Sequence, residues 1–207
     1  QQAGELTDPD HPANFVLMML VSMHDPGLVI LPTHRLISGV GDLRADQLQA
    51  LLSPYFEVEM IGAGADAARM TWELMEADGS QELLGFGSVA DGVWQTARFR
   101  APEQMAQVAA EHSEAWRGLA VAVLQRVVLE KALAHGDTQP RCQYVHLLRE
   151  VNDAVAAKQC QVAALVPPAT MDQVAQIAGN LEKMPPKSTY FYPKLLSGLV
   201  FHSLKGN

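Results

Sequence analysis

The sequence predicts a mixed α/β or α+β domain, in which helices flank a sheet with both parallel and antiparallel pairs. Strand-like and helix-like patterns alternate in the last third of the chain, and two strand-like runs flank Asp91-Gly92, a dipeptide typical of a tight hairpin. Hydrophobic residues make up 48% of the 207 residues and charged residues 18%, so the chain can bury a core. We expect residues 1–13 to be a flexible lead-in and residues 14–207 to form a single α/β domain.

Apolar runs of two kinds mark the expected strands. Asn14 to Met23 is a continuous apolar run that ends at a turn-forming His-Asp-Pro-Gly, which indicates a central buried strand. Tyr55 to Ile61 alternates apolar and polar residues, which is typical of a half-buried strand. Leu195 to Phe201 indicates a last buried strand that returns the chain to the core. The remaining strands are expected within residues 82–100 (two strands), 142–148 and 161–168.

Helical spacing of apolar residues predicts the helices. Thr170 and Gln173 form a capping box at the start of one of them. The segment Trp116 to His135 is apolar around most of its circumference, so we expect one largely buried helix there, either under the sheet or in a homodimer contact. The other helices are expected at 42–52, 66–77, 102–113, 149–158 and 170–180.

Charge and composition exclude several classes of function. The formal net charge of −8 disfavours a nucleic-acid-binding protein with a broad basic surface. The longest apolar runs are shorter than the roughly 20 residues that cross a bilayer, so we expect no membrane segment. Cys142 and Cys160 have no C-x-x-C spacing and no secretory signal precedes them, which favours a cytoplasmic protein without disulfides. The seven histidines show no metal-binding spacing, so no metal motif is expected.

A loose dinucleotide fingerprint, G-x-G-x-x-A, is formed by Gly62, Gly64 and Ala67. A dinucleotide-binding fold needs a right-handed crossover into a parallel strand, whereas the helix that follows here leads into the expected hairpin. We therefore favour a flexible loop over a cofactor site at this position.

The segment Leu31 to Leu36 places Thr33, His34 and Arg35 directly after an expected buried strand and a proline. An arginine fork with a hydroxyl and an imidazole can hold a phosphate or a carboxylate. The alternative is that Arg35 pairs with a carboxylate at the edge of the core, and the residues alone leave both interpretations open.

The segment "PPKSTYFYPK", residues 185–194, combines prolines with lysines and hydroxyls. The prolines restrict the backbone, which favours a preorganised loop, and the side chains offer cationic and hydroxyl donors without an acid or thiolate. This composition suits anion binding better than proton abstraction. Alternatively, the aromatic residues pack on the domain and the lysines are solvated. We expect the segment to face Thr33 to Arg35 across the C-terminal edge of the sheet, forming one basic pocket.

Two long segments, "NFVLMMLVSMHDPGLVILPTHRLI" and "MPPKSTYFYPKLLSGLVF", resemble the signature segments of a bacterial and archaeal family, domain of unknown function 1015. The resemblance covers the chain as the C-terminal half of a family member. It implies a truncated or processed chain, because full-length members carry an upstream Asp-Gly-His-His-Arg segment similar to one in ParB-like free serine kinases. The anion-binding candidates that match the family pattern are Thr33, His34, Arg35, Lys187, Ser188, Thr189, Tyr192 and Lys194.

Two hypotheses of function follow. In the first, the chain is the anion-binding half of a small-molecule, serine-kinase-like phosphotransferase, and it binds a phosphorylated metabolite or a nucleotide. In the second, it is a non-catalytic module that binds a metabolite or assembles subunits.

No complete set of catalytic residues is recognisable, so we expect the chain alone to have no turnover. The cofactor stays unidentified, with a nucleotide as a candidate. The distance between Arg35 and Lys187 distinguishes the hypotheses, because one ligand must reach both.

Overall fold

The computed structural model describes residues 8–134 and 139–204. It contains two compact units, one of residues 30–190 and one of residues 1–29 and 191–207. Strands β1 (Val29–Leu31) and β8 (Tyr190–Tyr192) form a two-stranded sheet at the residues where the chain passes between the units. The expected domain boundaries stay a prediction, because a compact unit is not by itself an independently folding domain.

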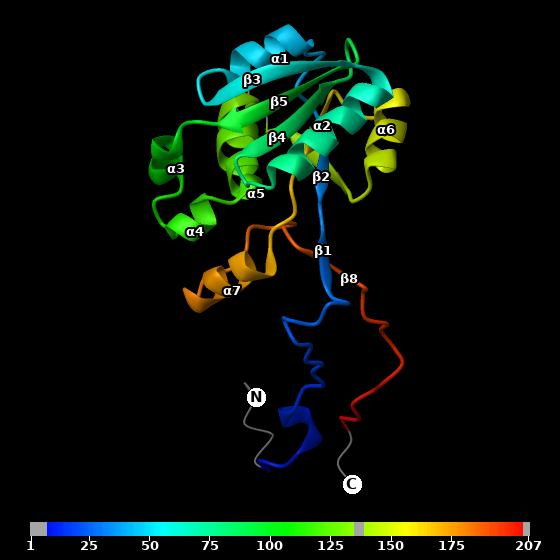
Figure 1. Cartoon of the computed structure of the whole chain (residues 1–207). Coiled ribbons are helices and arrows are strands. Elements are labelled where there is room, and N and C mark those ends of the chain that lie inside the picture. The colour runs from blue at the N-terminus through cyan, green and yellow to red at the C-terminus, as the bar shows by residue number, and fades with distance from the viewer. Residues whose placement is uncertain (1–7, 135–138, 205–207) are drawn as a thin grey trace. The chain divides into compact units, whose positions relative to one another are not determined.

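A six-stranded sheet with helices on both faces forms the unit of residues 30–190, which confirms the predicted fold class (Figure 1). The strand order is β3-β5-β4-β7-β2-β6. These strands are β2 (His34–Ser38), β3 (Phe56–Ala63), β4 (Leu83–Ser88), β5 (Val93–Phe99), β6 (Arg141–Val145) and β7 (Val162–Leu165). The helical elements of this unit are α1 (Ala45–Leu52), α2 (Gly64–Asp78), α3 (Pro102–Val108), α4 (Glu114–Arg117), α5 (Ala120–Val123), the π-helical segment η2 (Leu124–Ala132), α6 (Leu148–Ala156) and α7 (Met171–Gly179).

The expected parallel pairing is not found in this sheet, because all neighbouring strands pair antiparallel. Strands β6 and β7 are joined through α6 and run in the same direction, as the strand–helix–strand pattern predicts. However, β2 lies between them and pairs antiparallel with both. A strand from far away in the sequence therefore separates the two strands that the local pattern placed side by side.

The hairpin prediction is confirmed. Strands β4 and β5 pair antiparallel, and Gly92 between them adopts a φ of 70°, a conformation that residues with a side chain rarely adopt. The predicted capping box is also present, since Thr170 Oγ1 accepts from the Gln173 N–H at 3.2 Å and Gln173 Oε1 accepts from the Thr170 N–H at 2.9 Å. Local sequence signals thus specify these elements.

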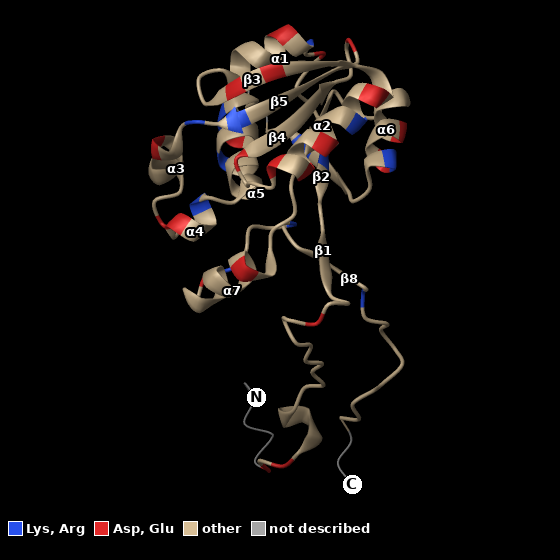
Figure 2. Cartoon of the chain, viewed as in Figure 1, with Lys and Arg blue, Asp and Glu red and all other residues tan. Residues whose placement is uncertain are grey.

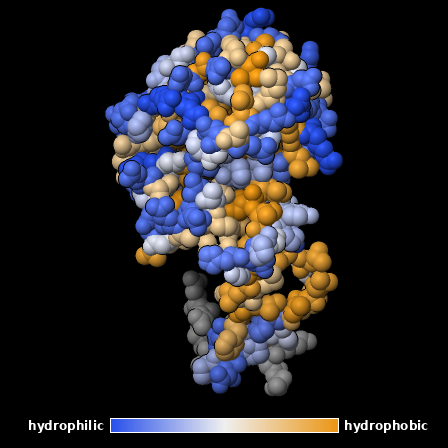
Figure 3. All heavy atoms as spheres, viewed as in Figure 1, coloured by the Kyte–Doolittle hydropathy of each residue, from blue (hydrophilic) through white to orange (hydrophobic). Residues whose placement is uncertain are grey.

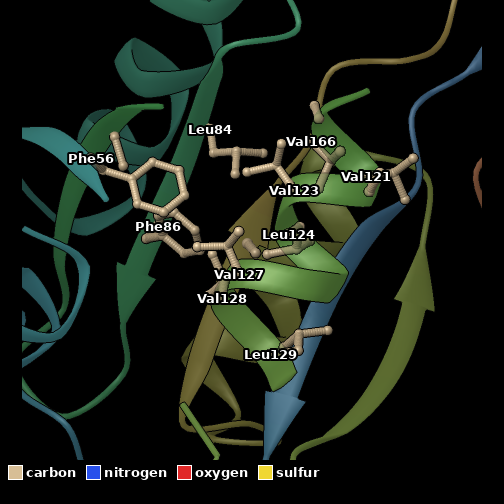
Figure 4. Close-up of a cluster of buried hydrophobic side chains, with 14 of the residues drawn as sticks. Phe56, Leu84, Phe86, Val121, Val123, Leu124, Val127, Val128, Leu129 and Val166 are labelled. Atoms are coloured by element: carbon tan, nitrogen blue, oxygen red, sulfur yellow. The ribbon is translucent and has the colours of Figure 1, made fainter. Parts of the chain in front are cut away.

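The predicted buried helix is divided into α4, α5 and η2, and its burial is confirmed. Side chains of α5 and η2 pack against Leu84 and Phe86 of the sheet (Figure 4). Leu124 and Val127 have no solvent exposure. This face of the sheet is also covered by α1, whereas α2 and α6 pack on the opposite face with Leu36 and Trp94. His135, the expected end of the helix, lies outside the described residues.

Two expected buried strands are not strands in the structure. The runs 14–23 and 195–201 have no β-structure, and their large apolar side chains are exposed. Their surfaces are largely hydrophobic and carry few charges (Figures 2 and 3). The described part of their unit has one short 3₁₀ helix, η1 (Pro12–Asn14), besides the ends of β1 and β8. A continuous apolar run indicates a tendency to be buried, but a strand also needs a neighbouring edge to pair with.

No helix among the described residues is both long enough and apolar enough to span a bilayer.

Lysine substitutions test the exposure of these two runs. Leu20 and Phe201 are 85% and 83% exposed, so replacing both with lysine should leave the midpoint of thermal unfolding nearly unchanged and reduce the binding of a hydrophobic dye. Leu124→Ala is the comparison, because truncating a fully buried leucine costs about 2–5 kcal/mol of unfolding free energy. A loss of stability in the lysine variant as large as that of Leu124→Ala would show that the runs are buried strands after all.

Candidate functional site

His34 and Arg35 are the first two residues of β2, and Thr33 directly precedes them. The expected buried strand before them is wrong, because β1 is exposed or half-buried. The three candidate residues lie on two faces of the sheet. Side chains alternate along a strand, so Arg35 lies on the face of α5 and η2, and His34 lies on the face of α2. All of Thr33, His34 and Arg35 are buried. The structure therefore brings Thr33 and Arg35 together and turns His34 away from them.

Arg35 is the most unusual group on its face, because a guanidinium that is only 4% exposed is rarely found without an acidic partner. Its Nη1 donates to the Thr33 carbonyl, and its Nη2 donates to the Lys187 carbonyl at 3.1 Å. The guanidinium carbon lies 5.3 Å from the centre of the Tyr144 ring, a cation–π distance. No Asp or Glu in the described ranges forms an ion pair with Arg35. Burial lowers the pKa of Arg35 from its ordinary value, although an arginine stays protonated in proteins.

The segment that begins at Pro185 reaches Arg35 through its backbone. Lys187 has a φ of 56°, the left-handed region, which costs roughly 1–2 kcal/mol for a residue with a side chain. The hydrogen bond from Arg35 to its carbonyl helps to hold this conformation. The Lys187 side chain is exposed, Ser188 is buried and Thr189 is half-buried. Among the described residues, the buried Ser188 Oγ has no hydrogen-bond partner.

The expected proximity of the two segments is present, since Arg35 contacts Lys187 directly. The contact is to the Lys187 backbone and not to its ammonium group. Tyr192 and Lys194 belong to the unit of residues 1–29 and 191–207, so their part in an anion site stays a prediction.

His146, which the sequence interpretation did not single out, connects the same two segments. Its Nδ1 lies 3.0 Å from the Pro32 carbonyl oxygen, to which it can donate, and 3.4 Å from Thr33 Oγ1. Its ring lies 3.9 Å from the Tyr190 ring, centre to centre. The signal that could have identified it is its position directly after β6, the strand that pairs with β2.

His34 has a structural environment. Its Nδ1 accepts from the Val166 N–H at 3.2 Å, and its ring meets Trp72 edge to face at 5.0 Å. Burial lowers the pKa of His34 to about 3, and the nearby Arg35 and His146 add to this effect. The imidazole is therefore neutral at physiological pH and cannot supply charge to an anion.

The glycine-rich segment is not the expected flexible loop, because Gly62 lies in β3 and Gly64 begins α2. It also does not have dinucleotide-binding topology. Strand β3 lies at the edge of the sheet and pairs antiparallel with β5, and α2 leads into the β4–β5 hairpin. Gly64 begins α2 with a φ of 84°, so glycine is required here by the turn. Among the described residues, no group of three or more His, Cys, Asp or Glu side chains could hold a metal ion.

The buried Arg35 guanidinium thus joins β2 to the segment at Lys187 in a unit of mixed α/β fold. The chain belongs to the family described as protein of unknown function (DUF1015), whose model matches residues 1–122, more than half of the chain. The matched residues include the first of the two segments that resemble this family, which confirms the recognition.

Two solved structures are similar to the chain. A free serine kinase in complex with AMP is 13% identical with a TM-score of 0.46, and 84% of this chain covers 57% of that one. A conserved hypothetical protein from Pyrococcus furiosus is 10% identical with a TM-score of 0.45, and 84% of this chain covers 60% of that one. The chain thus spans less than two thirds of the length of either. No curated protein matches it.

The stability of the protein should depend on pH through His34. The unfolded state has the ordinary histidine pKa of 6.5 and binds a proton that the folded state, with a pKa of about 3, does not. The contribution of His34 to the unfolding free energy is thus complete above pH 6.5 and is lost as the pH falls. The unfolding free energy then decreases by up to about 1.4 kcal/mol per pH unit. His34→Asn, which retains an acceptor near the position of Nδ1, should reduce this slope when urea unfolding is measured between pH 7 and pH 5.

His24→Asn is the matched control, because His24 is exposed and its replacement should leave the slope as it is in the parent protein. Equal slopes for His34→Asn and the parent would contradict the burial of a neutral His34.

Proposed function

We propose that Arg35 and the segment beginning at Lys187 bind the phosphate of a phosphorylated small molecule or nucleotide, as part of a small-molecule, serine-kinase-like phosphotransferase. The observation that carries the proposal is the buried Arg35 guanidinium, which contacts carbonyls and a ring but forms no ion pair with an acidic side chain in the described part of the chain.

Electrostatics supports this proposal. Burying a charged group costs several kcal/mol, and two carbonyl dipoles with one aromatic face offset only a part of it. A phosphate oxygen is a strong acceptor for a guanidinium, and a charge-assisted hydrogen bond would add to the stabilisation. The Ser188 hydroxyl is a second donor of suitable chemistry, because it is buried and lacks a partner among the described residues. The exposed side chain of Lys187 carries a further positive charge in the same segment.

The arrangement suits phosphoryl transfer better than acid–base chemistry. Phosphoryl transfer depends mainly on positioning the substrate and on stabilising negative charge, both of which cations and hydroxyls supply. Among the described residues, no Asp or Glu forms an ion pair with Arg35, whose polar contacts are to carbonyl oxygens. We therefore propose that this chain supplies the anion-binding part of the site, and we expect it to bind phosphate compounds without turnover.

A second candidate function is a non-catalytic module in which the same contact is architectural. Two arginine nitrogens donate to backbone carbonyls, an arrangement that ties the strand β2 to the segment at Lys187. In that case Arg35 would contribute to stability and to the assembly of the fold, and no anion would bind.

Calorimetric titration with inorganic phosphate and with AMP distinguishes the two functions. Arg35→Ala should weaken binding by roughly 1.5–3 kcal/mol, the contribution of a charge-assisted hydrogen bond. Ser188→Ala should weaken binding by about 1 kcal/mol while leaving the unfolding free energy unchanged or slightly higher, because it removes a buried hydroxyl without a partner. Arg141→Ala, which removes an exposed arginine from the neighbouring strand β6, should bind as the parent does.

The Ser188 variant keeps the test decisive if Arg35→Ala does not fold. Absence of phosphate binding by the parent, or unchanged affinity in Ser188→Ala and in any folded Arg35 variant, would leave the architectural function.

A further inference from the structure

A cleft of about 390 Å³ lies at the C-terminal end of α2, within the unit of residues 30–190. Its walls come from the end of α2, the residue before Thr33, and the turn between β7 and α7. The volume is within the range of about 300–1,000 Å³ that is usual for small-molecule sites. The residues that form its walls include Pro32, Trp72, Met75, Gln81, Pro167 and Pro168.

The Trp72 indole is held in place by a contact with His34. His34 meets it edge to face at 5.0 Å, and the Val166 N–H fixes the orientation of the His34 ring. His34 is almost fully buried, so it cannot turn away without opening the core. This contact limits the movement of the Trp72 side chain, which forms part of the cleft wall.

The opposite wall is also fixed. Gln81 donates to the Pro168 carbonyl at 2.9 Å, and its Oε1 accepts from the Ala120 N–H at 3.1 Å. Two consecutive prolines restrict the backbone further. On the floor, a Cβ added at Gly85 would lie 3.0 Å from the Met75 sulfur, so α2 packs closely on β4 and Met75 has little freedom. A cleft with such walls is preorganised for a ligand.

The chemistry of the walls selects a flat and uncharged ligand. An indole, two prolines and a methionine offer apolar and polarisable surfaces, against which a planar ring stacks well. The exposed Glu76 carboxylate also lies at the cleft, where it disfavours an anion and can accept from an amino group. Phosphate and carboxylate ligands are thus poorly suited to this cleft, in contrast to the surroundings of Arg35.

From this geometry we infer that the cleft binds a planar, neutral heteroaromatic ring of the nucleobase class, which stacks on Trp72 and presents an amino group to Glu76. The inference does not depend on the anion site, because Arg35 lies on the opposite face of the sheet. It adds a ring-binding site to a chain whose proposed function concerns the phosphate of its ligand.

Adenosine, an uncharged nucleoside, is the probe. In NMR spectra of the full chain, the Trp72 indole N–H should shift and saturate on titration, whereas those of the buried Trp94 and Trp116 should not. Ribose 5-phosphate, which carries the charge without the ring, should leave the Trp72 signal in place. Trp72→Phe identifies the signal and retains an aromatic surface.

Variants of α2 complete the test. Trp72→Ala should weaken adenosine binding about tenfold or more, as expected when a base loses its stacking partner, and Trp72→Phe should lose less. Leu74→Ala, an exposed position on the same helix, should bind adenosine as the parent does, and so should Arg35→Ala or Ser188→Ala. A Trp72 signal unmoved by adenosine, or moved equally by ribose 5-phosphate, would overturn the inference even if Trp72→Ala does not fold.

Discussion

The candidate anion site depends on one hydrogen-bonded group, the buried guanidinium of Arg35. It extends from β2, which lies between β6 and β7, so its backbone is fixed by ladders on both sides. From this rigid position it donates to the carbonyl of Lys187, a residue 152 positions away in the sequence, and so determines where the segment at Lys187 and Ser188 lies. A phosphate site formed in this way would be preorganised, because neither partner needs to move to meet the ligand.

The sequence predicted those parts of the fold that local signals specify. Asp91-Gly92 predicted the hairpin, Thr170 and Gln173 predicted a helix start, and the apolar circumference of residues 116–135 predicted burial. Strand order was not predictable in the same way, because the insertion of β2 between β6 and β7 depends on which edge is available and not on local pattern. The prediction of buried strands at 14–23 and 195–201 was wrong for a related reason. The apolar composition of these runs indicates burial, but no sequence signal says whether a neighbouring strand edge is available for pairing.

The site shows a similar division. Composition identified Arg35 and the segment from Lys187 to Thr189, and the structure brings their backbones into contact. Composition could not indicate that His34 points to the other face of the sheet, because the face of each side chain depends on the residue at which β2 begins. His146 and Trp72 carry no motif at all, and they become visible only when α2, β2 and β6 are assembled.

NMR of the arginine side chains shows whether the Arg35 guanidinium receives an anion. The Arg35 Nε–H signal, assigned by its loss in Arg35→Lys, should shift and saturate as inorganic phosphate is added at constant ionic strength. The exposed Arg141 should at most drift in proportion to the phosphate concentration. An Arg35 signal that stays in place, or that drifts no differently from that of Arg141, would show that Arg35 binds no phosphate and only ties β2 to Lys187.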